Sequence, residues 1–282
     1  MEIRQKRAND LWFSEEQTSN MKLSLRLSDV LMSKSSPYQD ILVVKTEEYG
    51  RMLVLDGAIQ ITERDEFFYA EMMAHVALCS HPSPKRVLII GGGDGATLRE
   101  VLRHENIEKA TLVDIDEEVI KASKEYLPTI SVAFEHPRAD IRPMDALKFV
   151  ASCRDEFDIV IVDSTDPVEF AAGLFRAPFY RDVLNALKDD GIIVAQTESP
   201  VSDTHVVRGA YSEMSTVFPV VKICWSPMPS YPSGMWTYTI GSKKHDPAVV
   251  RRPAPEGTKY YTEDIHRAAF TIPPFLRDLL KK

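Results

Sequence analysis

A chain of 282 residues, of which 44% are hydrophobic and 27% charged, can bury the core of one large domain or of a core domain with a small appendage. Its formal net charge of −8 argues against nucleic acid or an anionic membrane as a partner, because either would favour a basic face. The cysteines Cys79, Cys153 and Cys224 lie far apart, which favours a reducing compartment over a disulfide framework or a zinc site.

Neither a signal peptide nor a membrane helix is predicted. The first residues contain no apolar run, and no later stretch reaches the roughly 18 uninterrupted apolar residues of a membrane span. We therefore expect a soluble, cytoplasmic protein.

Residues 1–62 carry the signals of short β-strands. Apolar and polar residues alternate over 21–31. Apolar runs follow at 41–44, 52–55 and 59–61. Gly50 and Gly57 suit tight turns between these runs. The segment is predicted to form a small antiparallel β domain.

From residue 63 helices and strands alternate. A helix is predicted over 63–78, with one buried stripe made of Phe67, Ala70, Met73, Ala74 and Ala77. Near-continuous apolar runs, typical of strands buried on both faces of a parallel sheet, follow at 86–90, 110–115, 158–162 and 192–196. Helical segments separate them at 95–104, 116–127 and 175–188. The pattern predicts an α/β fold over residues 63–282: a Rossmann-like, doubly wound, mostly parallel sheet.

A glycine-rich loop, Gly91 to Ala96, follows the first of these strands and opens a helix, and Asp114 ends the next strand. This spacing predicts a nucleoside site at the carboxyl ends of the strands. The loop also matches the relaxed NAD pattern. Asp94, however, would repel a pyrophosphate and suits a sulfonium or an amine, so a cationic nucleoside is favoured.

Two further acidic segments follow strand ends. Asp145-Ala146 could accept from an adenine amino group and leave room for the ring, or Asp145 could cap a helix over 146–152. Asp163 and Asp166 could converge on one small group, or form a turn. An amine with a pKa near ~10 must lose a proton before it attacks carbon, which gives paired carboxylates a chemical task. This chemistry requires neither a metal nor a covalent intermediate.

Several ordered segments resemble the spermidine synthases over nearly the whole chain. They are LDGAIQITERDEFFYAEM (55–72), GGGDGATLREVL (91–102), VDID (113–116), DSTDP (163–167), AQTESP (195–200), YPSGMWTYTIGSK (231–243) and KYYTEDIHRAAFTIPPF (259–275). The resemblance implies aminopropyl transfer from decarboxylated S-adenosylmethionine, as co-substrate, to a small amine, with methylthioadenosine as product. It also implies a homodimer or homotetramer.

The resemblance implies a role for each matching residue. Asp163 would accept the proton of the attacking amine, and Asp166 would bind the acceptor's amino end. Tyr69 and Tyr231 would line the acceptor channel. Asp94 would contact the amine of the donor, and Asp114 its ribose hydroxyls. Asp145 and Ala146 would contact the adenine, and Gln39 would contact the nucleoside from the N-terminal domain.

Two departures from the family pattern bear on the acceptor. Ala70 stands where the family usually has His or Gln, and Glu169-Phe170 replaces Gly-Pro. These changes could widen the acceptor end, or be neutral. Putrescine is the first expectation, and agmatine or a longer polyamine the second. A methyltransferase using intact S-adenosylmethionine, a non-catalytic polyamine-binding protein and an NAD oxidoreductase are the competing functions.

Overall fold

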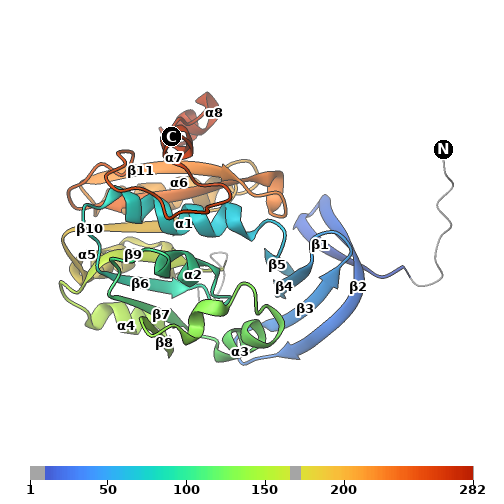
Figure 1. Ribbon diagram of the computed structural model, residues 1–282. Helices are drawn as coiled ribbons and strands as arrows, with labels where there is room; N and C mark the ends of the chain where they lie inside the picture. The colour runs from blue at the N-terminus through green and yellow to red at the C-terminus, as the bar shows by residue number, and fades with distance from the viewer. Residues whose placement is uncertain (1–9, 166–172, 282) are drawn as a thin grey trace.

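The computed structural model describes residues 10–165 and 173–281, and its first element is a small sheet (Figure 1). Neighbouring strands are antiparallel, in the order β1 (Trp12–Thr18), β2 (Met21–Ser35), β3 (Asp40–Thr46), β4 (Arg51–Leu55) and β5 (Ala58–Thr62). Gly50 and Gly57 have φ values of 73° and 83° in the turns that flank β4, as the sequence predicted. β1 was not predicted, because its sequence WFSEEQT is largely polar.

The second sheet has seven strands in the order β11-β12-β10-β9-β6-β7-β8. Their bounds are β6 (Arg86–Gly91), β7 (Lys109–Asp114), β8 (Ala139–Pro143), β9 (Phe157–Asp163), β10 (Leu187–Gln196), β11 (Val220–Pro227) and β12 (Met235–Ser242). Only β12 runs antiparallel to its neighbours, β10 and β11. The mostly parallel, doubly wound sheet is therefore confirmed, and the β11–β12 pair is an addition that was not predicted.

Helices cover both faces of this sheet. They are α1 (Glu66–Ser80), α2 (Ala96–Leu102), α3 (Glu117–Tyr126), α4 (Ala146–Ser152), α5 (Ala177–Ala186), α6 (Thr204–Ser215), α7 (Glu263–Ala269) and α8 (Pro274–Leu279). Val87 and Ile89 of β6 pack in one core cluster with α1 and α2. Leu88 and Ile90 pack in another with α4 and α5. Successive side chains of a strand point to opposite faces, so a run that is apolar throughout fits a sheet covered on both sides.

Ala70, Met73, Ala74 and Ala77 of the predicted stripe on α1 are buried and Phe67 is half-buried, but the burial extends well beyond that stripe. Every residue from Ala70 to Ser80 is buried, including Glu71 and His75. One side of the helix packs on β9, β10 and β11. On another side, the Glu71 carboxylate accepts three backbone N–H bonds from residues 259–261 of the C-terminal segment. A helix with neighbours on every side needs no polar face.

The small sheet lies beside the edge of the larger sheet toward which β6 and β7 point (Figure 1). One core cluster joins the two, with Ile41 and Val43 of β3 packed among Val119 and Ala122 of α3. The carboxyl ends of the parallel strands therefore face the small sheet.

Candidate active site

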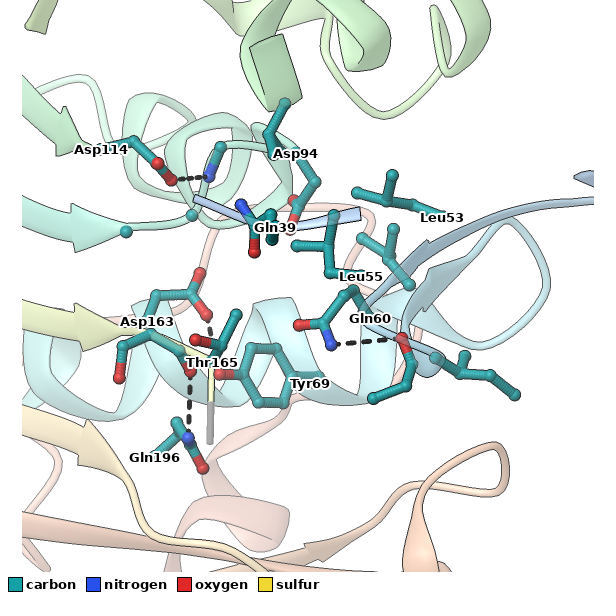
Figure 2. Close-up of a pocket in the computed structure, with 18 of the residues that line it drawn as sticks. Gln39, Leu53, Leu55, Gln60, Tyr69, Asp94, Asp114, Asp163, Thr165 and Gln196 are labelled. Atoms are coloured by element: carbon teal, nitrogen blue, oxygen red, sulfur yellow. Dashed lines mark hydrogen bonds between the residues drawn. The ribbon is translucent and has the colours of Figure 1, made fainter. Parts of the chain in front are cut away.

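A cavity of about 690 Å³ lies between the carboxyl edge of the larger sheet and the small sheet (Figure 2). Leu53, Leu55 and Gln60 line it from the small sheet, and the glycine loop lines it from the larger one. β6 lies between β7 and β9, so the chain winds away from it in both directions. Such a switch point is where open α/β sheets bind ligands.

The glycine loop after β6 folds tightly against the end of β9. Gly91 and Gly92 have φ values of 78° and 69°, in the left-handed region that glycine adopts readily. A Cβ on Gly91 would lie 2.1 Å from the backbone oxygen of Asp163. The Gly92 N–H donates to that same oxygen at 2.8 Å. The glycines therefore let the loop and the strand end form one wall of the cavity.

Asp163 presents its carboxylate to the cavity from the end of β9 (Figure 2). The Tyr69 hydroxyl donates to its Oδ1 at 2.7 Å, and the Thr97 hydroxyl donates to its Oδ2 at 2.6 Å. Burial raises the pKa of Asp163, and the hydrogen bonds from Thr97 and Tyr69 oppose that rise. The result is an oriented carboxylate that holds a proton more readily than one in water.

Asp94 lies in the glycine loop and lines the same cavity. Its Oδ1 accepts from the Ala96 N–H at 2.7 Å. Burial is the main cause, and the nearby charge of Asp163 the second, of a pKa of Asp94 raised to about 7. Because two like charges repel in a site withdrawn from water, an arriving cation would stabilise both in the ionised form.

Asp114 is held against the glycine loop, as its position at the end of β7 predicted. Its Oδ2 accepts from the Gly93 N–H at 3.0 Å, and its Oδ1 accepts from the Asp116 N–H at 2.8 Å. Burial raises the pKa of Asp114 to about 6. The carboxylate is therefore fixed by the backbone at the cavity wall.

The described part of the cavity wall is acidic and contains no Lys, Arg or His. Its acidic members are Glu15, Glu16, Asp56, Glu66, Asp94, Asp114, Asp145, Asp163, Glu198 and Asp203. Some have cationic partners behind the wall: the Arg99 guanidinium donates to Glu66 at 2.6 Å, for example. Within the described residues Asp94, Asp114 and Asp163 form no ion pair, and their hydrogen-bond donors are backbone N–H and hydroxyl groups. An anionic ligand would be repelled here, and a cationic one attracted.

The proposed nucleoside residues Asp145, Ala146 and Gln39 also line the cavity. Asp145 is the N-cap of α4, as the alternative interpretation expected, because its Oδ1 accepts from the Leu147 N–H at 2.9 Å. Gln39 enters from the small sheet, and its Nε2 donates to Asp116 Oδ2 at 2.9 Å.

Tyr69 and Tyr231 form an aromatic part of the wall, with ring centroids 5.8 Å apart. The Trp236 ring supports Tyr231 edge-on at 4.7 Å. The Tyr231 hydroxyl donates to the backbone oxygen of Gln60, which ties this wall to the small sheet. Burial is the main cause, and the charge of Asp163 the second, of a Tyr69 pKa raised well above its usual value. The hydroxyl therefore keeps its proton and remains a hydrogen-bond donor.

Ala70 is not brought to the cavity. Its side chain is fully buried in the cluster that joins α1 to the small sheet and α3, and it is absent from the described lining. Consecutive helix residues point about 100° apart, so a helix that turns Tyr69 to the cavity turns Ala70 elsewhere. Ala70, expected from the family pattern to act at the acceptor end, therefore lies outside the described lining. Asp166 and Phe170 lie outside the described residues.

Several lining residues were not singled out from the sequence. They are Gln60, Glu66, Thr97, Gln196, Glu198 and Asp203. Gln196 ends β10, and its Nε2 donates to the Ser164 backbone oxygen at 3.0 Å. The rule that indicated Asp114 and Asp163, a polar residue at the carboxyl end of a buried strand, would also have indicated Gln196. Thr97 offered no such signal, since a threonine near a helix start is ordinarily a surface residue.

A second group of His and carboxylate side chains lies at the amino end of β9, away from the cavity. His81, Asp158 and Asp190 have ligand atoms within 4.8 Å of one another. Lys188 Nζ donates to the two carboxylate oxygens of Asp158 at 2.9 and 3.1 Å. The Ser83 N–H donates to His81 Nδ1 at 3.2 Å, which places the histidine proton on Nε2, toward Asp190. Asp158 is therefore held by an internal ion pair with Lys188, while the neutral His81 lies with its Nε2 3.3 Å from Asp190 Oδ1.

In the described part of the chain, every helix is too short or too polar to span a bilayer.

Comparison with known proteins agrees with the geometry. Residues 66–252 match the spermine/spermidine synthase domain, and residues 11–63 match the spermidine synthase tetramerisation domain. A polyamine aminopropyltransferase of Desulforudis audaxviator (strain MP104C) is 50% identical over 273 residues, covering 95% of this chain and 98% of the relative. One of Bacillus subtilis (strain 168) is 44% identical over 275 residues, covering 97% and 100%.

Solved structures give the same result. A crystal structure of spermidine synthase in complex with the transition-state analogue AdoDATO has a TM-score of 0.94 at 40% identity, covering 99% of this chain and 98% of that one. Spermidine synthase from Thermotoga maritima has a TM-score of 0.91 at 39% identity, covering 99% and 98%.

Fold and cavity define the class: a Rossmann-like α/β protein with an acidic site at its topological switch point. Within that class the chain belongs to the spermidine synthase family of polyamine aminopropyltransferases, and it is an aminopropyltransferase. The resemblance stated from the sequence motifs is thereby confirmed.

Proposed function

We propose that this chain transfers the aminopropyl group of decarboxylated S-adenosylmethionine to putrescine, giving spermidine and methylthioadenosine. The observation that carries the proposal is the acidic wall without a basic lining residue in its described part. A sulfonium donor without a carboxylate and a diamine acceptor are both cationic, so each offsets the repulsion among these acids. Intact S-adenosylmethionine carries a carboxylate, and NAD a pyrophosphate, that this wall would repel.

On the donor side we assign Asp94 to the aminopropyl amine and Asp114 to the ribose hydroxyls. Asp145 and Ala146 would bind the adenine, and Gln39 would contact the nucleoside. All five line one cavity, with Asp114 and Asp145 at the ends of the neighbouring strands β7 and β8, which supports a nucleoside laid along the sheet edge.

On the acceptor side Asp163 would take a proton from the attacking amine, and Asp166 would bind the acceptor's amino end. The amine nitrogen forms a bond to the carbon next to sulfur, the carbon–sulfur bond breaks, and the sulfonium leaves as a neutral thioether. Because the sulfonium is already a good leaving group, orientation of amine, carbon and sulfur supplies much of the rate. Tyr69 and Tyr231 would line the path of the acceptor's methylene groups.

Putrescine remains the first choice of acceptor, and agmatine or a longer polyamine the second. The widening expected from Ala70 loses its support, because that side chain lies in the core rather than in the wall. Only Glu169 and Phe170, which lie outside the described residues, still favour a larger acceptor.

We also propose that the chain works as a homodimer or homotetramer. Residues 11–63 match a tetramerisation domain. The same segment carries large apolar side chains that are well exposed in the single chain, including Trp12 at 49%, Met21 at 43% and Val30 at 46%. Such side chains on one small sheet are typical of a surface covered by another copy.

The test is a panel of putrescine, agmatine and spermidine, each assayed with the decarboxylated and the intact donor while methylthioadenosine is measured. We expect methylthioadenosine only with the decarboxylated donor, and fastest with putrescine. Turnover of the intact donor into a methylated product would favour a methyltransferase. No turnover with any pair would leave a polyamine-binding protein, and measurable binding of a nicotinamide cofactor would reopen the oxidoreductase reading.

A further inference from the structure

We infer that Thr97 is a positioning residue for the transfer reaction, and that its hydroxyl orients Asp163 and keeps it ready to accept a proton. This inference rests on the proposed role of Asp163 as that acceptor. Thr97 Oγ1 lies 2.6 Å from Asp163 Oδ2, in hydrogen-bond geometry.

The carboxylate of Asp163 is held from two helices at once. Thr97 comes from the first turn of α2, and Tyr69 comes from α1. Each hydroxyl donates to a different carboxylate oxygen, so the plane of the carboxylate is fixed from both sides; Figure 2 shows the bond from Tyr69. Each oxygen has two lone pairs, so one on each remains for the acceptor amine.

The Thr97 side chain is fully buried. A buried hydroxyl without a partner is unfavourable, and inside a helix a threonine often bonds back to the carbonyl one turn earlier. Here the donor is aimed at Asp163 instead. The Thr97 hydroxyl stabilises the ionised form of Asp163 more than the protonated form, because a hydrogen bond to a charged acceptor is stronger than one to a neutral acceptor.

Titratable groups face Asp163 from every neighbouring element. They are Tyr69 on α1, Asp94 in the glycine loop, Asp114 at the end of β7, Tyr231 before β12 and Tyr238 on β12. Burial favours a protonated Asp163, and the tyrosines stay neutral because burial raises their pKa values. Thr97 and Tyr69 oppose that tendency with hydrogen bonds. Loss of one of the two donors should therefore shift the acid limb of the rate profile, which reports Asp94 and Asp163 as a pair.

The experiment compares Thr97→Val with Thr97→Ser in the full chain. Valine keeps the shape and the buried methyl group but removes the hydroxyl, whereas serine keeps the hydroxyl and removes a methyl group. We expect Thr97→Val to move the acid limb of kcat/KM upward by about one to two pH units, and to lower the alkaline plateau as well because Asp163 loses one of its two anchoring hydrogen bonds. Thr97→Ser should keep the wild-type limb. The ionisation of the acceptor amine is common to all three proteins and cancels in the comparison.

Thr97→Ala provides a second protein without the hydroxyl if the valine variant does not fold, and binding of methylthioadenosine reports an intact donor site in each. An unshifted acid limb in a folded valine or alanine variant overturns the role of Thr97. A serine variant shifted as far as the valine variant also overturns it, because the effect would then come from packing. The role of Asp163 fails separately, if Asp163→Asn retains wild-type turnover.

Discussion

Gly91 lies directly opposite Asp163 where β6 pairs with β9. The pairing brings the first residue of the glycine loop against the backbone of the residue that we assign as proton acceptor. The loop that we assign to the donor and the carboxylate that we assign to the acceptor's proton are therefore fixed by the same strand register. A change in the loop should affect both substrates.

Gly91→Ala should disrupt this arrangement. The new Cβ would lie 2.1 Å from the Asp163 backbone oxygen, at a φ of +78°. We expect a loss of both donor binding and turnover, with a lower melting temperature. The control is Gly209→Ala in α6, where a Cβ would meet nothing within 4 Å. Alanine there should stabilise the chain by up to about 1 kcal/mol. Equal effects at the two glycines would contradict the close approach at Gly91.

Asp163→Asn should lower kcat while the donor site stays intact. An amide cannot accept the proton of the attacking amine, so we expect a loss of roughly 10²- to 10⁴-fold. Binding of methylthioadenosine, measured by calorimetry, should change little. Asp56→Asn removes the same charge from a cavity residue in the turn before β5, where Asp56 Oδ1 accepts from the Asp40 N–H at 2.8 Å. It should lose far less activity, and a comparable loss would indicate a general charge effect.

Asp94 should make the ligand-free protein less stable as the pH rises. Burial raises its folded-state pKa from 3.8 to about 7, so between these values the folded chain binds more protons than the unfolded chain. Stability then falls with increasing pH across that window. Asp94→Asn removes this contribution. The gap in unfolding free energy between variant and wild type should widen by about 1–3 kcal/mol from pH 5 to pH 8 in urea titrations. A constant gap would show that Asp94 ionises normally.

The parallel strands β6 and β9 were predictable because each contains an unbroken run of apolar residues. Both faces of β6 and β9 are covered by helices, so every side chain from Val87 to Ile90 is apolar. The cavity-lining acids Asp114 and Asp163 were predictable for a related reason: each ends such a strand. The carboxyl ends of parallel strands meet at one edge of the sheet. A polar residue that directly follows such a strand therefore lies at that edge, whatever the sequence of the next helix.

The β11–β12 pair was not predictable in this way, because its interior contains hydroxyl groups. Thr237 and Thr239 of β12 are fully buried, and each lies 3.1 Å from the Thr197 hydroxyl. A buried polar group satisfied by a residue some forty positions away breaks the hydrophobic pattern of its own strand. Ala70 was expected at the acceptor end for a different reason. It follows Tyr69 in the sequence, but the two side chains point to different parts of the molecule.

Glu71 should anchor the C-terminal segment to α1. Its side chain is 1% exposed, and its carboxylate accepts from the backbone N–H groups of Lys259, Tyr260 and Tyr261 at 2.7, 2.9 and 2.7 Å. In Glu71→Gln, the amide NH₂ replaces one oxygen and must face backbone N–H donors, so at least one of them loses its acceptor.

We expect Glu71→Gln to lower the free energy of unfolding by about 1–3 kcal/mol, the cost of a buried donor left without a partner. Urea titration measures the loss, and proteolysis or hydrogen exchange over residues 259–261 should show the segment released before global unfolding. The matched control is Glu108→Gln, whose side chain is 67% exposed and which should change stability by less than about 0.5 kcal/mol. If the two variants are equally stable, the three hydrogen bonds to Glu71 do not hold the segment in place, and the C-terminal segment must be fixed instead by the burial of Tyr261.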